Sequence, residues 1–408
     1  MRINKYPGTV FAICYLTSLS AVAEIISEAP ALQAVVQAAY ERYPALALPD
    51  VVRQQGQAIR RQASGFLADD PSLSLRHETD EVTDNFGFNS WEANVKMPLW
   101  LPGQRKRSLN VANAVEQEAE SLTPFYKWRV SGEVRELLWS IRIAEANEVL
   151  ARAAVDSAQA LKADIDKRVQ AGELALTDQI LADKERLVRD IELITRRANV
   201  EALRKEYRML TGLIEIPEDI LEQDAEGTSL PETHPAIVVA GQRAGRAQTE
   251  RDRARHEKRS NPVLALGARN ERAESGLPHD TIMSLELSLP LGLKYQSASG
   301  IADAQRQLVE QKISYASVQR ELEKQLILAG SEKHRTAQAL KLTQRQQRLA
   351  AEGLRLAQRA FELGESNLFT LLQARTQALA AERDLLIRQL EQGRAVARHN
   401  QALGVILE

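Results

Sequence analysis

Cysteine is nearly absent from this sequence, since Cys14 is the only one in 408 residues. No disulfide can form within the chain, and zinc sites built from several thiolates are excluded. Aromatic residues make up only 5%, and the formal net charge is −2, so no overall field favours nucleic acid or an anionic membrane surface. Beyond the N-terminus, no apolar run is long enough for a membrane-spanning helix.

What the sequence has in quantity is Ala, Leu, Gln, Arg and Glu, a composition typical of long helices. The N-terminal segment is different. Basic residues precede a moderately apolar run over 10–23 that ends in Ala-Val-Ala, a small-x-small cleavage pattern. We therefore expect residues 1–23 to be a signal peptide that is removed on export, with maturation near Glu24. Cys14 lies inside this segment, so the mature chain would carry neither a thiol nor an acylated cysteine as a lipid anchor.

The chain is a tandem duplication. Tyr43-Pro44-Ala45-Leu46 matches His234-Pro235-Ala236-Ile237 at an offset of 191, and three further pairs keep an offset of 192: Gly172 with Gly364, Leu176 with Leu368, and Gly212 with Gly404. A nearly constant offset indicates two equivalent halves. We place the first over 24–212 and the second over 234–408, with an acidic linker containing two prolines over 213–233.

Each half predicts the same series of elements. A first helix, over about 31–68 with a break near 44–49, leads into a β-hairpin over 71–99, and the second half repeats this with a helix over about 236–259 and a hairpin over 262–291. A long helical hairpin follows in each half. Its first helix, from about 104 to 171, would span ~100 Å at 1.5 Å per residue. We expect Pro124 to kink or interrupt it.

The turns of the two long hairpins have related sequences. Gly172 is followed by Thr177 and Asp178, which together predict a helix C-cap and then the N-cap of a returning helix. Apolar residues also recur at intervals of seven, a spacing that predicts coiled-coil packing between neighbouring helices. The residues with this spacing form three series: Ile180, Leu187 and Ile194; Leu342, Leu349, Leu356 and Leu363; and Leu372, Leu379 and Leu386.

The four predicted strands alternate apolar and polar residues, as in a sheet with one apolar face. Four strands are too few for a closed barrel within one chain. The apolar face could pack on the helices of a soluble protein, or several chains could pool their strands in a membrane, where an open sheet edge is not tolerated. The export signal favours the second interpretation, which turns these residues toward lipid: Trp91, Ala93, Val95, Met97, Met283, Leu285 and Leu287.

No catalytic constellation is apparent. The six histidines are scattered without a partner at metal-ligand spacing, and there is no phosphate-binding Gly loop or nucleophile elbow. A basic run over 243–259 is interleaved with acidic residues and lacks aromatics, which indicates a solvated helix face rather than a nucleic-acid site. We therefore expect no enzyme activity, no cofactor and no bound metal.

Taken together, the duplication, the hairpin turns and the strand-to-helix sequence Pro102-Gly103-Gln104-Arg105 resemble the TolC family of outer-membrane efflux ducts of Gram-negative bacteria, and the last of these resembles its CzcC-like heavy-metal branch. The resemblance covers essentially the whole mature chain. It implies a mainly α fold with a small membrane β part, assembled as a homotrimer. The trimer would form a twelve-stranded barrel in the outer membrane and an α-helical barrel across the periplasm, where it would meet a periplasmic adaptor and an inner-membrane pump, expected to be of the RND type.

The resemblance also implies that the hairpin tips form the periplasmic gate and the contact with the adaptor. These tip residues are Gly172, Thr177, Asp178, Gly364, Ser366, Thr370 and Gln373. Some relatives carry acidic residues around this entrance. Here Asp178 fits such a position, but Thr370 and Gln373 do not, so we expect a weaker preference for cations.

Two other classes of protein remain as alternatives. A periplasmic adaptor has a single coiled-coil hairpin, whereas a structural coiled-coil protein needs no pore. The cargo stays open among metal ions, drugs and secreted proteins.

Overall fold

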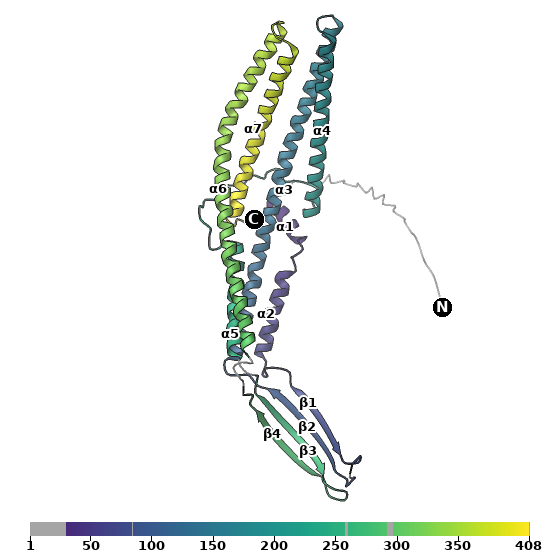
Figure 1. The fold of residues 1–408 in the computed structure, drawn as a ribbon, viewed down its shortest axis with the longest axis vertical. Helices are drawn as coiled ribbons and strands as arrows, with labels where there is room; N and C mark the ends of the chain where they lie inside the picture. Colours follow the sequence, from purple (N-terminus) through teal and green to yellow (C-terminus); the bar gives the residue numbers. More distant parts are fainter. Residues whose placement is uncertain (1–29, 84, 258–259, 292–296, 408) are drawn as a thin grey trace, which may run out of the picture.

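A computed structural model describes residues 30–83, 85–257, 260–291 and 297–407. The expected signal peptide lies outside these residues. The molecule is elongated, with a β-sheet at one end and two long helical hairpins at the other (Figure 1). Among the described residues, no helix is long and apolar enough to cross a membrane. The elements in chain order are α1 (Leu32–Glu41), α2 (Leu48–Ser64), β1 (Ser72–Thr79), β2 (Asn89–Pro98), α3 (Gln104–Gln170), α4 (Leu176–Thr211), α5 (Pro235–His256), β3 (Val263–Arg272), β4 (Asp280–Ser288), α6 (Ala298–Glu362) and α7 (Leu368–Ala402).

The predicted fold class, mainly helical with four strands, is confirmed. The long helices also end in register with the sequence repeat, because α3 stops at Gln170 and α6 at Glu362, 192 positions later. After each of these ends a glycine takes a left-handed backbone, with φ of 80° at Gly172 and 74° at Gly364. Both turns are closed by Schellman hydrogen bonds, such as the one of 2.8 Å from Glu173 N to Arg168 O.

A tertiary contact is duplicated along with the sequence. Gly212 and Gly404 end α4 and α7 with φ of 76° and 86°. A Cβ at Gly212 would meet the guanidinium of Arg42, and a Cβ at Gly404 would meet the imidazole of His234. The offset of 191 in this segment aligns His234 with Tyr43, so the two covering side chains come from adjacent positions of the repeat. In both halves the second long helix therefore ends at a glycine covered by a side chain from the start of that half.

Pro124 does not interrupt α3, which runs unbroken through it. The expected interruption was wrong because the neighbours of Pro124 are held by tertiary packing, while the expected kink stays a prediction. Leu122 and Tyr126 lie in the main core cluster, together with Val35 of α1 and Trp139 further along α3. Burial of several such side chains, at ~1.5–3 kcal/mol each, outweighs the ~3 kcal/mol that a proline costs within a helix.

The main core therefore lies at mid-length, where α1, α3, α4, the linker and the C-terminus meet. A smaller cluster lies near the hairpin tips and includes Ile165, Ala182, Phe361 and Leu368. The sheet contributes little to either cluster. Its strands pair in the order β1-β2-β3-β4, and all neighbours are antiparallel, so β1 and β4 are open edges.

Gly393 of α7 faces the buried indole of Trp139 on α3. A Cβ at Gly393 would overlap the Cη2 atom of that ring. We predict that Gly393→Leu lowers the free energy of unfolding by ~2–3 kcal/mol, the upper part of the range for overpacked cores. The midpoint of thermal unfolding, followed by circular dichroism, measures this effect.

Gly245 on α5 is the matched control, because no atom lies within 4 Å of a Cβ added there. Gly245→Leu should leave stability unchanged or raise it by up to ~1 kcal/mol through helix propensity. Equal midpoints for the two variants would show that the contact between Gly393 and Trp139 does not limit how closely the helices pack.

Candidate functional site

The tip of the first long hairpin is the turn between α3 and α4. Its N-cap is Ala175, with an extended backbone, rather than Thr177 or Asp178 as the sequence predicted. Thr177 and Asp178 lie in the first turn of α4, and the carboxylate of Asp178 accepts a hydrogen bond from Ala175 N at 3.3 Å. An acidic side chain at this third helical position satisfies the free N–H of the cap and complements the helix dipole. Asp178 therefore caps its own helix.

The tip of the second hairpin is capped by a different residue. Asn367 is the N-cap of α7, and its Oδ1 accepts hydrogen bonds from both the backbone N and the Oγ1 of Thr370, each at 2.9 Å. Ser366 lies just before this cap, and Gln373 is exposed one turn later. The groups that cap α7 are therefore neutral, whereas the first tip uses the carboxylate of Asp178.

Contacts between the two hairpins hold the tips together. The guanidinium of Arg375 on α7 donates a hydrogen bond to Ser157 Oγ on α3, and burial lowers the pKa of Arg375. Closer to the turns, the guanidinium of Arg168 lies 5.2 Å from the centroid of the Phe361 ring. Sequence reasoning did not single out any of these four residues, because the partners in each pair lie far apart in the chain and on different helices.

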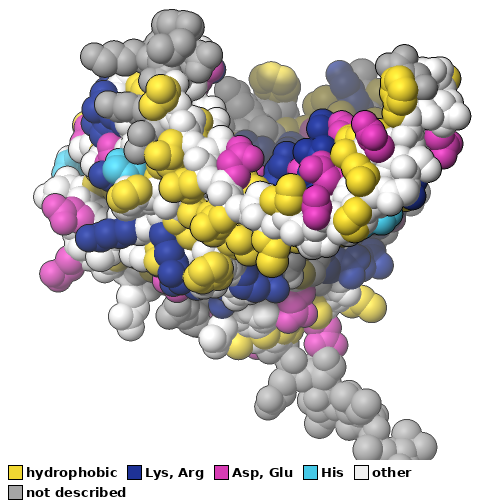
Figure 2. All heavy atoms as spheres, turned by 90° about the horizontal axis from the view of Figure 1, so that it is seen from below, with side chains coloured by type: hydrophobic (Ala, Val, Ile, Leu, Met, Phe, Trp, Pro, Cys, Tyr) yellow, Lys and Arg dark blue, Asp and Glu magenta, His cyan; other side chains and the backbone are white. Residues whose placement is uncertain are grey.

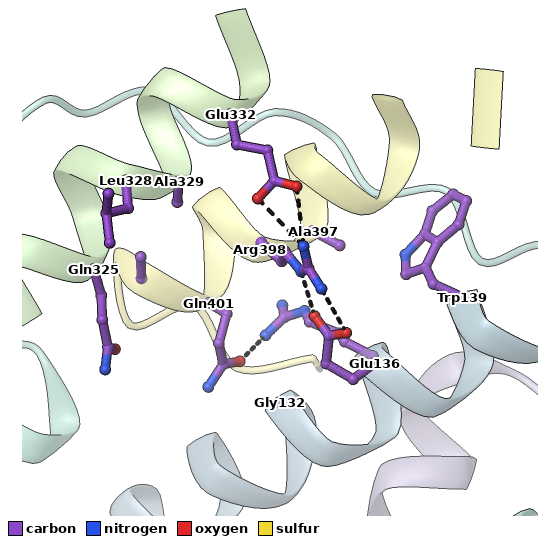
Figure 3. Close-up of a pocket in the computed structure, with 12 residues that line it drawn as sticks. Gly132, Glu136, Trp139, Gln325, Leu328, Ala329, Glu332, Ala397, Arg398 and Gln401 are labelled. Carbon is purple, nitrogen blue, oxygen red and sulfur yellow. Dashed lines mark hydrogen bonds and ion pairs between the residues drawn. The ribbon is translucent and has the colours of Figure 1, made fainter. Parts of the chain in front are cut away.

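A second group of contacts joins the hairpins at mid-length, beside a cavity of about 310 Å³ (Figure 3). Glu136 of α3 accepts hydrogen bonds from Arg398, at 2.6 Å from Nε, and from Arg394. Arg398 also donates to Glu332 of α6 at 3.0 Å. Burial alone would raise the pKa of Glu136, but the hydrogen bonds from Arg398 and Arg394 outweigh it and lower the pKa.

The sign of the pH effect at this joint follows from that shift. A carboxylate with a lowered pKa in the folded state stabilises the fold above the ordinary pKa of glutamate. Its contribution is lost as the pH falls through the lowered value. The joint between the hairpins is therefore at full strength at neutral pH.

The register of the sheet places all seven residues predicted to face lipid on one side. In the central row Leu73, Val95, Leu266 and Leu285 lie directly opposite one another across the four strands. Most large hydrophobic side chains of this face are 41% to 85% exposed, whereas Met97 and Leu264 are partly buried. Seen from the sheet end, hydrophobic side chains gather in a broad patch (Figure 2). The reverse side carries mostly polar residues, among them Asn94, Lys96 and Ser284.

Among the described residues, no three His, Cys, Asp or Glu side chains come together in an arrangement that could hold a metal ion. His234, for example, is buried, which lowers its pKa to about 4. Its Nδ1 accepts a hydrogen bond from Ala236 N at 3.2 Å at the start of α5, so it serves the fold.

Two long helical hairpins joined to a four-stranded sheet define the fold of the TolC-like outer-membrane channels. The chain is similar to the outer membrane protein VceC from Vibrio cholerae, with a TM-score of 0.75 and 15% identity over 91% of this chain and 96% of that one. The CmeC outer membrane channel of Campylobacter jejuni gives a TM-score of 0.72 and 15% identity, over 99% and 94% of the two chains. For the open state of the MtrE outer membrane channel of Neisseria gonorrhoeae the values are 0.65 and 18%, over 92% and 89%.

These comparisons confirm the fold that the sequence predicted. No protein-family model matches the sequence, and a comparison with curated proteins finds no match either. At identities of 15% to 18% the likeness concerns the fold. The resemblance to the heavy-metal branch stays a prediction.

Proposed function

We propose that this protein is the outer-membrane channel of a tripartite efflux system, a passive duct built from three copies. The observation that carries the proposal is the sheet, which has two open edges and an apolar face on which most large side chains are exposed. Unpaired backbone groups at a sheet edge cannot be left in a bilayer. Joining β4 of one copy to β1 of the next removes every edge, and three copies of a four-stranded sheet give twelve strands.

In this assembly the apolar face of the sheet contacts lipid and the polar face lines a water-filled lumen. The residues proposed to contact lipid are Trp91, Ala93, Val95, Met97, Met283, Leu285 and Leu287. The helices extend the duct through the periplasm, and the tips meet a periplasmic adaptor and, through it, an inner-membrane pump of the RND type. The channel performs no chemical step, so its cargo is set largely by the pump.

Fractionation and native mass test the proposal directly. We expect a trimer in the outer-membrane fraction that migrates differently on a denaturing gel with and without heating. A water-soluble monomer would contradict the duct. It would return the protein to the alternatives of a periplasmic adaptor or a coiled-coil protein without a pore.

The proposed gate is at the tips, which open by sliding of the hairpins relative to their neighbours. We predict that cross-linking cysteines introduced at Asp178 and Thr370 blocks export. Because the cargo is open, the readout is ion conductance of the purified trimer in a planar lipid bilayer. Reduction of the cross-link should restore the open level. Conductance that is the same before and after reduction would rule out a gate at these residues.

A further inference from the structure

The apolar face of the sheet gives way to polar side chains at the end farthest from the helices (Figure 1). The last row on this face that is still apolar consists of Leu75, Ala93, Ala268 and Met283. Two residues further along each strand, the side chains on the same face are His77, Trp91, Asn270 and Thr281. The final row comprises Thr79, Asn89 and Arg272. In the proposed membrane, these two outer rows lie where the hydrocarbon ends and the lipid headgroups begin.

Charged side chains of the four strands are sorted between the two faces of the sheet. The register places these carboxylates on the polar face: Glu78, Glu92, Glu271, Asp280 and Glu286. It also places there the basic side chains of Arg76, Lys96 and Arg269. Arg272 is the one Asp, Glu, Lys or Arg of the described strands that lies on the side of the apolar face. An arginine within hydrocarbon is costly, so its place in the final row, at the headgroup level, fits an anionic partner.

Arg272 is held in place by a neighbouring loop but keeps donors free. Its Nε donates a hydrogen bond of 3.2 Å to the carbonyl oxygen of Gly87 in the loop between β1 and β2. Glu271, the preceding residue in the chain, pairs with Arg269 at 2.7 Å instead. With the described residues, the two Nη atoms of Arg272 form no hydrogen bond and no ion pair. A planar guanidinium with these donors free can hold a phosphate through two parallel hydrogen bonds.

Neutral hydrogen-bonding groups and an aromatic ring adjoin this arginine. Asn89 lies directly opposite Arg272 in the register, and its Nδ2 atom is 3.3 Å from Nε2 of His77. The His77 ring lies against the indole of Trp91, with 4.3 Å between the ring centroids. Trp91 is 55% exposed. Arg272, Asn89, His77 and Trp91 thus form one contiguous group, the outer cluster.

The composition of the outer cluster indicates the class of ligand. Its single cation suits a phosphate, but neutral amide, imidazole and indole groups outnumber that cation. Such groups bind the hydroxyls and the C–H faces of sugars. Carboxylates in the loops beyond the cluster, at Asp80, Glu81 and Glu274, weaken the attraction for a ligand that offers negative charge alone. The cluster therefore fits a phosphorylated sugar better than a simple anion.

We propose that the outer cluster binds the headgroup of a phosphorylated glycolipid in the outer leaflet of the membrane, with Arg272 at a phosphate and Asn89 and Trp91 at the sugar. This inference rests on the proposed function, which places this end of the sheet at the cell exterior. It adds the class of lipid and the residues that recognise it. Each copy in the trimer carries one such cluster.

Native mass spectrometry of the purified trimer, titrated with lipid, tests the proposal. The probe is bis-phosphorylated lipid A, an acylated glucosamine disaccharide, and the comparison lipid is dioleoylphosphatidylglycerol, which has a phosphate but no sugar. We expect one lipid A per copy, and binding of dioleoylphosphatidylglycerol that is weaker by about tenfold or more, because it leaves the polar groups beside the arginine without partners.

Two substitutions in the outer cluster should weaken the binding of lipid A. The expected loss is about tenfold for Arg272→Gln, the effect of losing a hydrogen bond to a charged group, and several-fold for Trp91→Leu. Arg76→Gln is the matched control, because it makes the same change of charge on the polar face of the sheet and should leave the affinity unchanged. Arg272→Lys keeps the charge without the planar guanidinium, so it should bind lipid A more weakly than the unchanged protein.

The outcomes separate this inference from the proposed function. A trimer that binds both lipids equally, or that loses as much affinity with Arg76→Gln as with Arg272→Gln, overturns the glycolipid site while the duct stands. If Arg272→Gln does not assemble, unchanged affinity of the Arg272→Lys and Trp91→Leu trimers overturns it as well. A native monomer overturns both proposals. Preference for lipid A that the cluster variants lose and Arg76→Gln keeps supports the inference.

Discussion

Replacing Glu222 by alanine is expected to lower the free energy of unfolding by ~3–5 kcal/mol, the cost of leaving a buried charge without its partner. Glu222 lies in the linker between the two halves. Its carboxylate accepts two hydrogen bonds of 2.8 Å from Arg135 on α3 and one of 3.1 Å from Asn400 on α7. The side chains of Arg135 and Glu222 are only 4% and 9% exposed. Solvent therefore cannot replace the lost partner.

The same linker supplies the control. Glu226 is exposed, so Glu226→Ala should change stability by no more than ~0.5 kcal/mol. The double variant Glu222→Ala with Arg135→Met removes both charges and should recover part of the loss, because no buried charge is then left alone. Thermal unfolding of the purified protein measures all three. If Glu222→Ala and Glu226→Ala unfold at the same temperature, the ion pair between Arg135 and Glu222 does not hold the linker to the helices.

The second large effect is expected on the sheet, where Leu285→Arg should prevent assembly in the outer membrane. Leu285 is 70% exposed and faces Leu266 in the central row of the apolar face. An arginine on the lipid side of a membrane strand costs ~2–4 kcal/mol at the bilayer midplane. The cost applies to each copy, so we expect at least a tenfold lower yield of heat-modifiable trimer from outer-membrane fractions.

Its control is the adjacent residue of the same strand. Ser284 pairs with Gly267 on the opposite, polar face, so Ser284→Arg should assemble with nearly the yield of the unchanged protein. The two variants have the same final charge and differ only in the side of the sheet that carries it. Equal yields from both would refute the assignment of the apolar face to lipid. Loss of the trimer with Ser284→Arg alone would mean that the opposite face contacts lipid.

Much of this architecture could be predicted because it depends on local signals. Alternation with a period of two placed the strands and their apolar face, and the paired glycines Gly172 and Gly364 placed the turns. The prediction was wrong where a local signal competes with its surroundings. Pro124 stays within α3 because its neighbours are buried. The N-cap of α4 is Ala175, because the backbone of that residue is extended and ends the turn, whatever its side chain.

The partners of the buried charges could not be predicted. Arg135 and Glu222 are separated by 87 residues, and Glu136 and Arg398 by 262. In the sequence each of them is one charge among 108 ionised Lys, Arg, Asp and Glu side chains (53 basic and 55 acidic). Only the meeting of α3, α7 and the linker removes Arg135 and Glu222 from water, and burial is what makes a pair of charges matter.

By itself the sequence determined the duplication, the type of each element and the two faces of the sheet, because each follows from the spacing of neighbouring residues. The tertiary structure decided which helices touch, and so which apolar stripes are buried within one copy and which, such as the series on α4 and α6, stay exposed. A period of seven identifies an apolar stripe along a helix but not the helix that packs against it. Which helix covers the stripe depends on how α3 and α7 pack across the boundary between the two halves.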